Sequence, residues 1–258
     1  MFTVVLCALL LAHGPIAQLA HYHAFADQAT RLSIPHGADV LSNLGFALVA
    51  AWGLLHLWPQ RSSAALAAGW HGYLLFLSGL ALTAVGSSFY HLAPDNTRLI
   101  FDRLPIALAC AGLLAAVRAE SLSKPDSARD TILLALFGVA SVAWWAFTDR
   151  HGVGDLRPYL LLQGLPLILI PLWQTVYRAP AAERIAFGAA LLLYVLAKGA
   201  EVYDQALLTQ FGVISGHTLK HLLAAGAAGV IVARLVRRCS PHQARPQQAG
   251  QRVSTAHH

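Results

Sequence analysis

Long apolar blocks alternate with short polar segments along most of the chain. Seven such blocks predict spanning helices, over residues 40–58, 70–90, 99–117, 131–147, 158–177, 185–200 and 216–236. A helix needs about 20 mostly apolar residues to cross a bilayer, so each block is close to the required length. No alternating strand pattern competes with them. We therefore expect an all-α, polytopic membrane protein built as a seven-helix transmembrane bundle.

An eighth apolar block, over residues 2–19, has two interpretations. It is either an extra N-terminal span or a signal segment. It has no basic residues at its start and no small-x-small cleavage site before His21, which favours a retained span. The predicted organisation is a hydrophobic segment over 1–20, a seven-helix domain over 21–238 and a disordered cytoplasmic tail over 239–258.

The composition supports a membrane location and changes how the charge is interpreted. Hydrophobic residues make up 57% of the chain and charged residues 12%, against about 25% charged residues in soluble domains. The net charge of +6 therefore does not indicate nucleic-acid binding, because basic residues in membrane proteins mark cytoplasmic loops. The cluster Arg234, Arg237 and Arg238 lies at the end of the last span and predicts a cytoplasmic C-terminus.

Two histidines open the last span. His217 and His221 are four residues apart, so both imidazoles project from one helical face, a spacing that suits two ligands of one zinc ion. Taken alone, such a pair is more often solvated or hydrogen-bonded than metal-bound.

A second polar group lies at the end of another span. Ser87 and His91 share a helical face, and Asp102 begins the next span after a short turn. Separately, Ser87 could bond to a backbone carbonyl, His91 could be interfacial, and Asp102 could pair with Arg103. The alternation of spans, however, brings all these groups and the histidine pair to the same, non-cytoplasmic end. Three imidazoles with an open position are typical of a zinc site that activates water.

The order of these motifs resembles the membrane-hydrolase superfamily of alkaline ceramidases, adiponectin-type receptors and haemolysin III proteins. The resemblance covers roughly residues 39–238. The sequence Asp102-Arg103-Leu104-Pro105 is similar to the Asp-x-x-Pro pattern of the alkaline ceramidases, and Ser42-Asn43 also resembles that branch.

The resemblance implies a function and a set of roles. His91, His217 and His221 would bind Zn²⁺, while Ser87 and Asp102 would be catalytic residues beside the metal. The seven-helix domain would then be a hydrolase that cleaves the amide bond of ceramide or another N-acyl membrane lipid, releasing a fatty acid and a sphingoid-type amine. The alternative is a non-enzymatic receptor or haemolysin III-like membrane protein with a structural zinc site.

The chain departs from the eukaryotic ceramidases before the first common span. Those proteins have an acidic calcium-binding stretch, whereas the corresponding loop here has only two carboxylates, Asp27 and Asp39, with several histidines. Calcium prefers several oxygen ligands, so calcium is doubtful here and no calcium-binding residue is assigned. The two carboxylates would either structure the loop or be ordinary interfacial residues. The sequence does not predict an oligomeric state.

Overall fold

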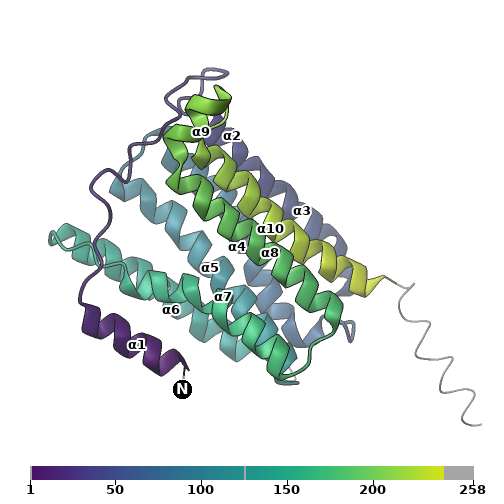
Figure 1. Cartoon of the computed structure of the whole chain (residues 1–258). Helices are drawn as coiled ribbons and strands as arrows, with labels where there is room; N and C mark the ends of the chain where they lie inside the picture. Colours follow the sequence, from purple (N-terminus) through teal and green to yellow (C-terminus); the bar gives the residue numbers. More distant parts are fainter. Residues whose placement is uncertain (1, 125, 241–258) are drawn as a thin grey trace, which may run out of the picture.

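The computed structural model describes residues 2–124 and 126–240, and these residues form helices joined by short connections (Figure 1). No β-strand occurs in this part of the chain; an isolated bridge between Arg31 and Ile34 is the nearest approach to one. The tail predicted over 239–258 lies outside the described residues from position 241 onward.

Seven helical segments are long and apolar enough to cross a membrane, as the hydropathy pattern predicts. The first, Gly37–Gln60, consists of α2 (Gly37–Ser42), α3 (Leu44–Leu57) and a short 3₁₀ turn. The others contain α4 (Trp70–Leu92), α5 (Asn96–Ser121), α6 (Ala128–Arg150), α7 (Arg157–Val176), α8 (Ala181–Val202) and α10 (Gly216–Cys239). The fold is thus an all-α seven-helix bundle of an integral, multi-pass membrane protein.

Helix α1 (Phe2–His13) is not among the seven. Its 12 residues are fewer than the ~20 needed to span a bilayer, because the helix ends before Gly14, whose φ is +84°. It lies beside α7 at the edge of the bundle (Figure 1).

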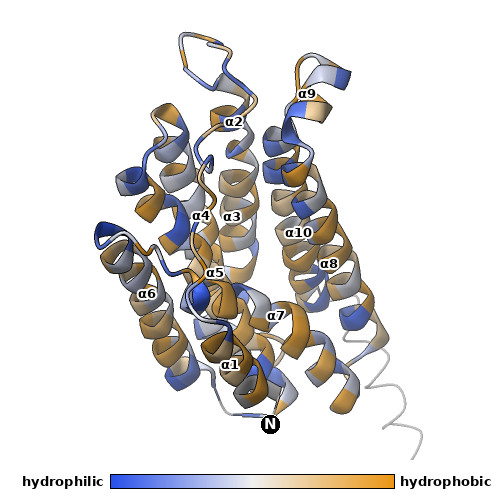
Figure 2. Ribbon diagram, turned by 60° about the vertical axis from the view of Figure 1, so that its left-hand side comes forward, coloured by the Kyte–Doolittle hydropathy of each residue, from blue (hydrophilic) through white to orange (hydrophobic). Residues whose placement is uncertain are grey.

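The bundle keeps apolar side chains both inside and outside. A core cluster lies between α3, α4, α5, α7 and α10, and a second one lies between α5, α6 and α7 around Trp145. Large apolar side chains such as Leu48, Leu136 and Leu192 remain exposed on the outer faces. Figure 2 shows that apolar residues predominate along the bodies of the helices. Exposed apolar belts of this kind are suited to contact with lipid.

A segment without long helices, residues 14–36, runs from α1 across one end of the bundle to α2 (Figure 1). The carbonyl of Ile16 accepts from Leu156 N at 2.8 Å, and Gln18 donates to Asn96 at 3.0 Å. Farther along, Arg31 donates to the carbonyl of Val213 at 2.9 Å. These contacts fix the segment over the end of the bundle where α10 begins.

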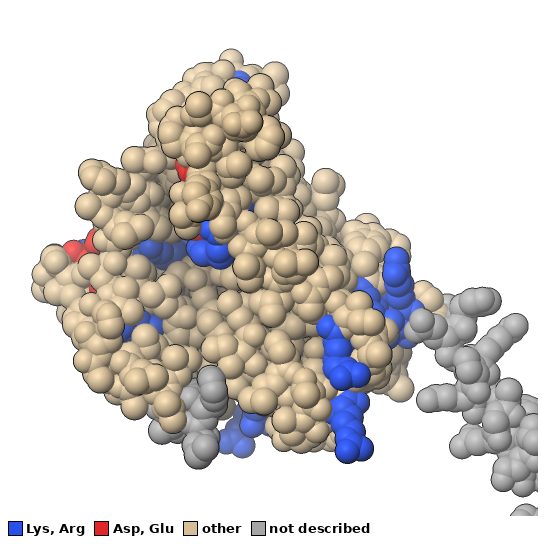
Figure 3. Space-filling model, viewed as in Figure 1, with Lys and Arg blue, Asp and Glu red and all other residues tan. Residues whose placement is uncertain are grey.

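Basic side chains gather at the opposite end of α10. Arg234, Arg237 and Arg238 occupy its last turns, while His217 and His221 occupy its first two. Figure 3 shows Lys and Arg side chains near this end of the bundle, and a second, mixed group of basic and acidic side chains toward the upper left of the same face. The histidines and the basic cluster therefore lie at opposite ends of one spanning helix.

Candidate metal centre

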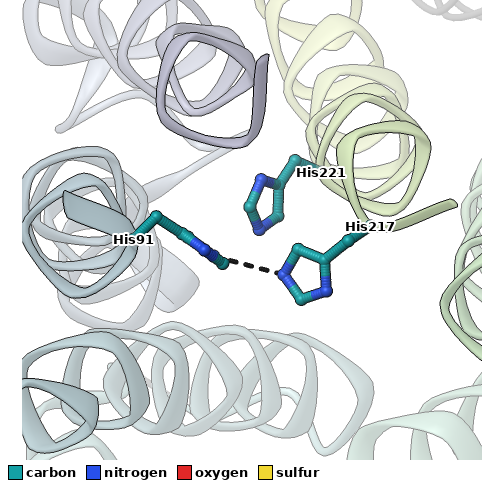
Figure 4. Close-up of side chains that lie close together, drawn as sticks. All are labelled: His91, His217 and His221. Carbon is teal, nitrogen blue, oxygen red and sulfur yellow. Dashed lines mark hydrogen bonds between the residues drawn. The ribbon is translucent and has the colours of Figure 1, made fainter. Parts of the chain in front are cut away.

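Three histidines from two spans meet inside the bundle. His91 comes from the last turns of α4, and His217 and His221 come from the start of α10. All three are buried, and one ligand nitrogen from each lies within 4.8 Å of the other two. Figure 4 shows the three rings turned toward a common point. The sequence prediction that these residues come together is confirmed, and this histidine cluster could hold a metal ion.

The start of α10 is fixed by polar contacts with two neighbouring elements. Ser215 caps the helix by accepting from Thr218 N at 2.9 Å, and its hydroxyl also donates to the Asp39 carboxylate at 3.1 Å. Asp204, at the start of α9 (Asp204–Phe211), accepts from His217 N at 2.7 Å. A carboxylate at a helix N-terminus satisfies a free N–H and complements the helix dipole.

Gly216 allows the same helix end to approach α8 closely. A Cβ at this position would lie 2.0 Å from the carbonyl oxygen of Ala200. Only glycine can therefore occupy the first position of α10 without moving the backbone of α8. The contact places His217 one residue beyond this close approach.

His221 is held in a single tautomer by the first span. Its Nδ1 lies 2.8 Å from Oγ of Ser42 and 3.2 Å from the carbonyl oxygen of Asp39. A carbonyl oxygen can only accept, so Nδ1 must carry the proton. The Nε2 lone pair of His221 is then free for a metal. Hydrogen bonds of this kind orient most metal-binding histidines.

The spacing of His91 and His217 fits two ligands of one tetrahedral ion. Their Nε2 atoms are 3.2 Å apart (Figure 4). Two nitrogens bound at about 2.0–2.1 Å to tetrahedral zinc would be about 3.3 Å apart. Nδ1 of His91 is buried without a hydrogen-bond partner among the described residues. No hydrogen bond at Nδ1 therefore fixes the tautomer of this ring. A set of three imidazoles suits Zn²⁺, although other transition metals also accept it.

A lysine lies directly beside the histidine cluster. Nζ of Lys220 is 2.9 Å from Nε2 of His217 and 2.9 Å from a carboxylate oxygen of Glu201 on α8. Glu201 also pairs with Lys198, three residues before it on α8. The side chain of Lys220 is only 20% exposed, against 56% for Lys198. The group in contact with His217 is therefore a half-buried ammonium.

Ser87 and Asp102 lie on the two helices that form one wall of the site. Ser87 is buried on α4, one turn before His91, and its hydroxyl approaches the half-buried carboxylate of Asp102 on α5. Gly86 makes this possible, because a Cβ there would lie 1.9 Å from the carbonyl oxygen of Phe101. The close approach of the two backbones brings the two polar side chains together.

Arg103 does not pair with Asp102, so the simple ion-pair interpretation of Asp102 is wrong. The guanidinium is buried and lies over the rings of Tyr22, Trp145 and Tyr159, with Trp145 nearest at 4.0 Å. It also donates to Gln18 at 2.7 Å. Arg103 thus joins the N-terminal segment to the bundle and leaves Asp102 facing Ser87.

The segment over residues 14–36 covers the site. The ring of Phe25 lies 4.6 Å from that of His91 and 4.4 Å from that of His217, between centroids. Asp27 is buried and accepts from the backbone N–H groups of Ala29 and Ala38. Asp39 is also buried and accepts from Thr218 at 2.5 Å. Both carboxylates therefore structure this loop and the start of α10.

Sequence reasoning missed several of these contacts. Lys220 had a usable signal, since it is three residues after His217 and so shares its helical face. Ser42 was noted for its resemblance to the ceramidase branch without a structural role, and nothing in the sequence indicates that Phe25 packs on the histidines.

The geometry alone thus defines the site as three buried imidazoles with a serine, a carboxylate and an ammonium around them. A scan against protein-family models and a search of curated proteins gave no match for the chain.

Proposed function

We propose that the protein is a zinc-dependent membrane hydrolase that cleaves the amide bond of ceramide or a related N-acyl lipid. The products would be a fatty acid and a sphingoid-type amine. The observation that carries the proposal is the convergence of three buried imidazoles in a membrane-spanning bundle. Ser87, one turn before His91 on the same helix, and Asp102, which it approaches, supply further polar groups. The resemblance of the same residues to the alkaline ceramidases supports the choice of an amide.

The ligands would be Nε2 of His91, His217 and His221, with Ser42 and the Asp39 carbonyl holding His221 in the required tautomer. Three protein ligands leave one position open, as in catalytic rather than structural zinc sites. Zinc bound there lowers the pKa of a coordinated water to about 7 and polarises a carbonyl group.

Ser87 would turn its one hydroxyl proton from Asp102 to the amide oxygen as negative charge develops on that oxygen. Its hydroxyl is buried, so this donor acts where water does not compete. Asp102 would take up the proton released by the attacking water and transfer it to the leaving nitrogen. The approach of Ser87 to Asp102 supports a shared site for these two steps.

The surroundings of the site support a lipid substrate. The helices present apolar faces outward, and the segment with Phe25 covers the end of the bundle over the histidines. An apolar substrate already dissolved in the bilayer suits such a site better than a polar one from solution. The basic cluster at the other end of α10 favours a site toward the non-cytoplasmic face, with the C-terminus in the cytoplasm.

The test uses purified protein in detergent, loaded with zinc and offered a panel of N-acyl sphingoids and other lipid amides. We expect fatty-acid release, about one bound zinc ion per chain, and loss of both in His217→Ala. The matched control is His56→Ala, which removes an exposed histidine on α3 bonded only to its own helix.

Two outcomes would contradict the proposal. Fatty-acid release that survives His217→Ala would remove the histidine cluster from the mechanism. Bound zinc without release from any amide would favour the receptor or haemolysin III-like alternative, in which the metal is structural.

A further inference from the structure

The ammonium of Lys220 lies against the histidine cluster, and the proposed reaction gives it no role. We propose that Lys220 is an anion-binding residue of this site, which holds a carboxylate oxygen of the fatty-acid product beside the metal. The inference rests on the proposed function, because it concerns the product of that same reaction.

The position of Lys220 follows from two contacts. One N–H donates to Glu201 at 2.9 Å, and another donates to Nε2 of His217 at 2.9 Å. The second contact uses the lone pair through which His217 would bind a metal. When that lone pair is taken by a metal, this N–H has no acceptor on the histidine and is free to donate to a ligand at the metal.

The local charge favours an anion. Glu201 pairs with Lys220 through one carboxylate oxygen and with Lys198 through the other. Glu201 therefore uses one N–H of the Lys220 ammonium and keeps this group in place. The positive charge of Lys220 lies directly at the histidine cluster, whereas that of Lys198 belongs to an exposed side chain.

A carboxylate matches this arrangement better than the intact amide. Amide hydrolysis converts a neutral acyl group into a carboxylic acid, which ionises, and an amine, which takes up the proton. A hydrogen bond from an ammonium to a carboxylate joins two opposite charges, whereas one to an amide oxygen has a full charge on the donor alone. Lys220 should therefore increase the affinity of the site for the fatty-acid product more than its affinity for the amide substrate.

A purely structural interpretation competes with this one. Lys220 and Glu201 join α10 to α8, and the ion pair could serve only to hold the two helices together. Lys198 separates the interpretations, since it pairs with the same Glu201 but is 56% exposed and makes no hydrogen bond to a histidine. An effect of helix attachment or general charge should appear in both lysines, whereas an effect at the metal should appear only in Lys220.

The experiment measures ligand binding rather than catalysis. The full chain is loaded with Co²⁺, and its visible absorption is recorded during titration with laurate and, separately, with uncharged dodecanamide. We expect Lys220→Met to raise the Kd for laurate at least about tenfold while changing that for dodecanamide less than about twofold. Lys220→Arg should recover part of the laurate affinity, and Lys198→Met should match the unmodified protein.

Equal laurate affinity in Lys220→Met and the unmodified protein, at equal cobalt content, would overturn the inference. An equal loss in Lys198→Met would overturn it as well. If Lys220→Met does not fold, Lys220→Gln tests the same loss of charge with a polar side chain.

The two proposals can fail separately. Laurate binding through Lys220 in a protein that cleaves no amide would overturn the proposed function alone. Amide cleavage combined with laurate affinities that ignore Lys220 would overturn this inference alone.

Discussion

A serine in the first span fixes the proton of a histidine in the last one. Ser42 donates its only hydroxyl proton to the Asp39 carbonyl, and its oxygen then faces Nδ1 of His221. In this orientation the hydroxyl oxygen can only accept a hydrogen bond from Nδ1. It therefore favours the same tautomer as the Asp39 carbonyl, with the proton on Nδ1. The polarity of one small side chain thus determines which nitrogen of His221 points into the cluster.

This contact predicts the effect of Ser42→Ala. The change removes one of two acceptors for the Nδ1 proton of His221, so the ring is less firmly oriented. We expect the zinc affinity to fall by about 10- to 100-fold, as for other outer partners of metal-binding histidines. Competition with a chromophoric chelator measures it.

Ser88→Ala is the matched control. Ser88 also bonds to a carbonyl of the first span, that of Val40, but does not contact a histidine. Its loss should leave the zinc affinity within about twofold of the unmodified value. Similar losses in both variants would mean that the effect comes from general loosening of the first span.

At the scale of whole elements, the site depends on how closely α4 approaches α5. Gly86 lies one residue before Ser87, where the carbonyl oxygen of Phe101 occupies the space that a Cβ would need. Backbone cannot move aside as a flexible side chain can. The distance between Ser87 and Asp102 is therefore set by a contact between two helices.

Gly86→Ala should separate the two helices. We expect the free energy of unfolding to fall by about 1–3 kcal/mol, the usual range for overpacking, with a lower Tm in detergent and weaker zinc binding. Gly164→Ala on α7 is the control, because no heavy atom lies within 4 Å of the Cβ it would add. There the gain in helix propensity should leave the Tm unchanged or raise it. An unchanged Tm in Gly86→Ala would show that the α4–α5 contact is not tight.

The seven spanning elements were predictable because lipid imposes a simple constraint on the sequence. A helix in hydrocarbon must be apolar over its whole length, so hydropathy alone located each span. The ends were less predictable: the helix of the last predicted span continues to Cys239, because arginines extend it beyond the apolar block. Helix α1 is shorter than its apolar block because the chain leaves the helix at Gly14.

The candidate site was predictable only in part. The spacing of His217 and His221 and the alternation of spans indicated which residues meet. The contacts of Lys220 with Glu201 and of Phe25 with two histidines join elements far apart in the chain. Hydropathy does not determine how two apolar helices are rotated relative to each other, or where a connecting segment packs. These contacts therefore could not be predicted from the sequence.

At the scale of the whole molecule, one carboxylate joins the N-terminal segment to the bundle. Asp155 lies between α6 and α7, is buried, and accepts from Ile16 N, Trp144 and Arg157. Burial alone would raise the pKa of Asp155, but the hydrogen bonds from Arg157, Trp144 and Ile16 outweigh it and hold that pKa well below its ordinary value. The charged form of Asp155 therefore stabilises the folded molecule.

The sign of the pH effect follows from this lowered pKa. The stabilisation is fully present above the unfolded-state pKa of about 3.9 and is lost as the pH falls toward the folded-state pKa. We expect the Tm difference between the unmodified protein and Asp155→Asn to be constant from about pH 5 to 7. It should shrink below about pH 4, which thermal unfolding in detergent measures. A difference that grows in acid would contradict this assignment.

The histidine cluster also has a consequence for the order of events during synthesis. His91 lies in the second span, the tautomer of His221 depends on the first, and two of the three imidazoles lie in the seventh. Chains emerge from the ribosome with the N-terminus first. A nascent or truncated chain that ends before α10 has one imidazole of the three, so it cannot assemble the cluster. Metal uptake would then mark the moment at which the last helix has inserted.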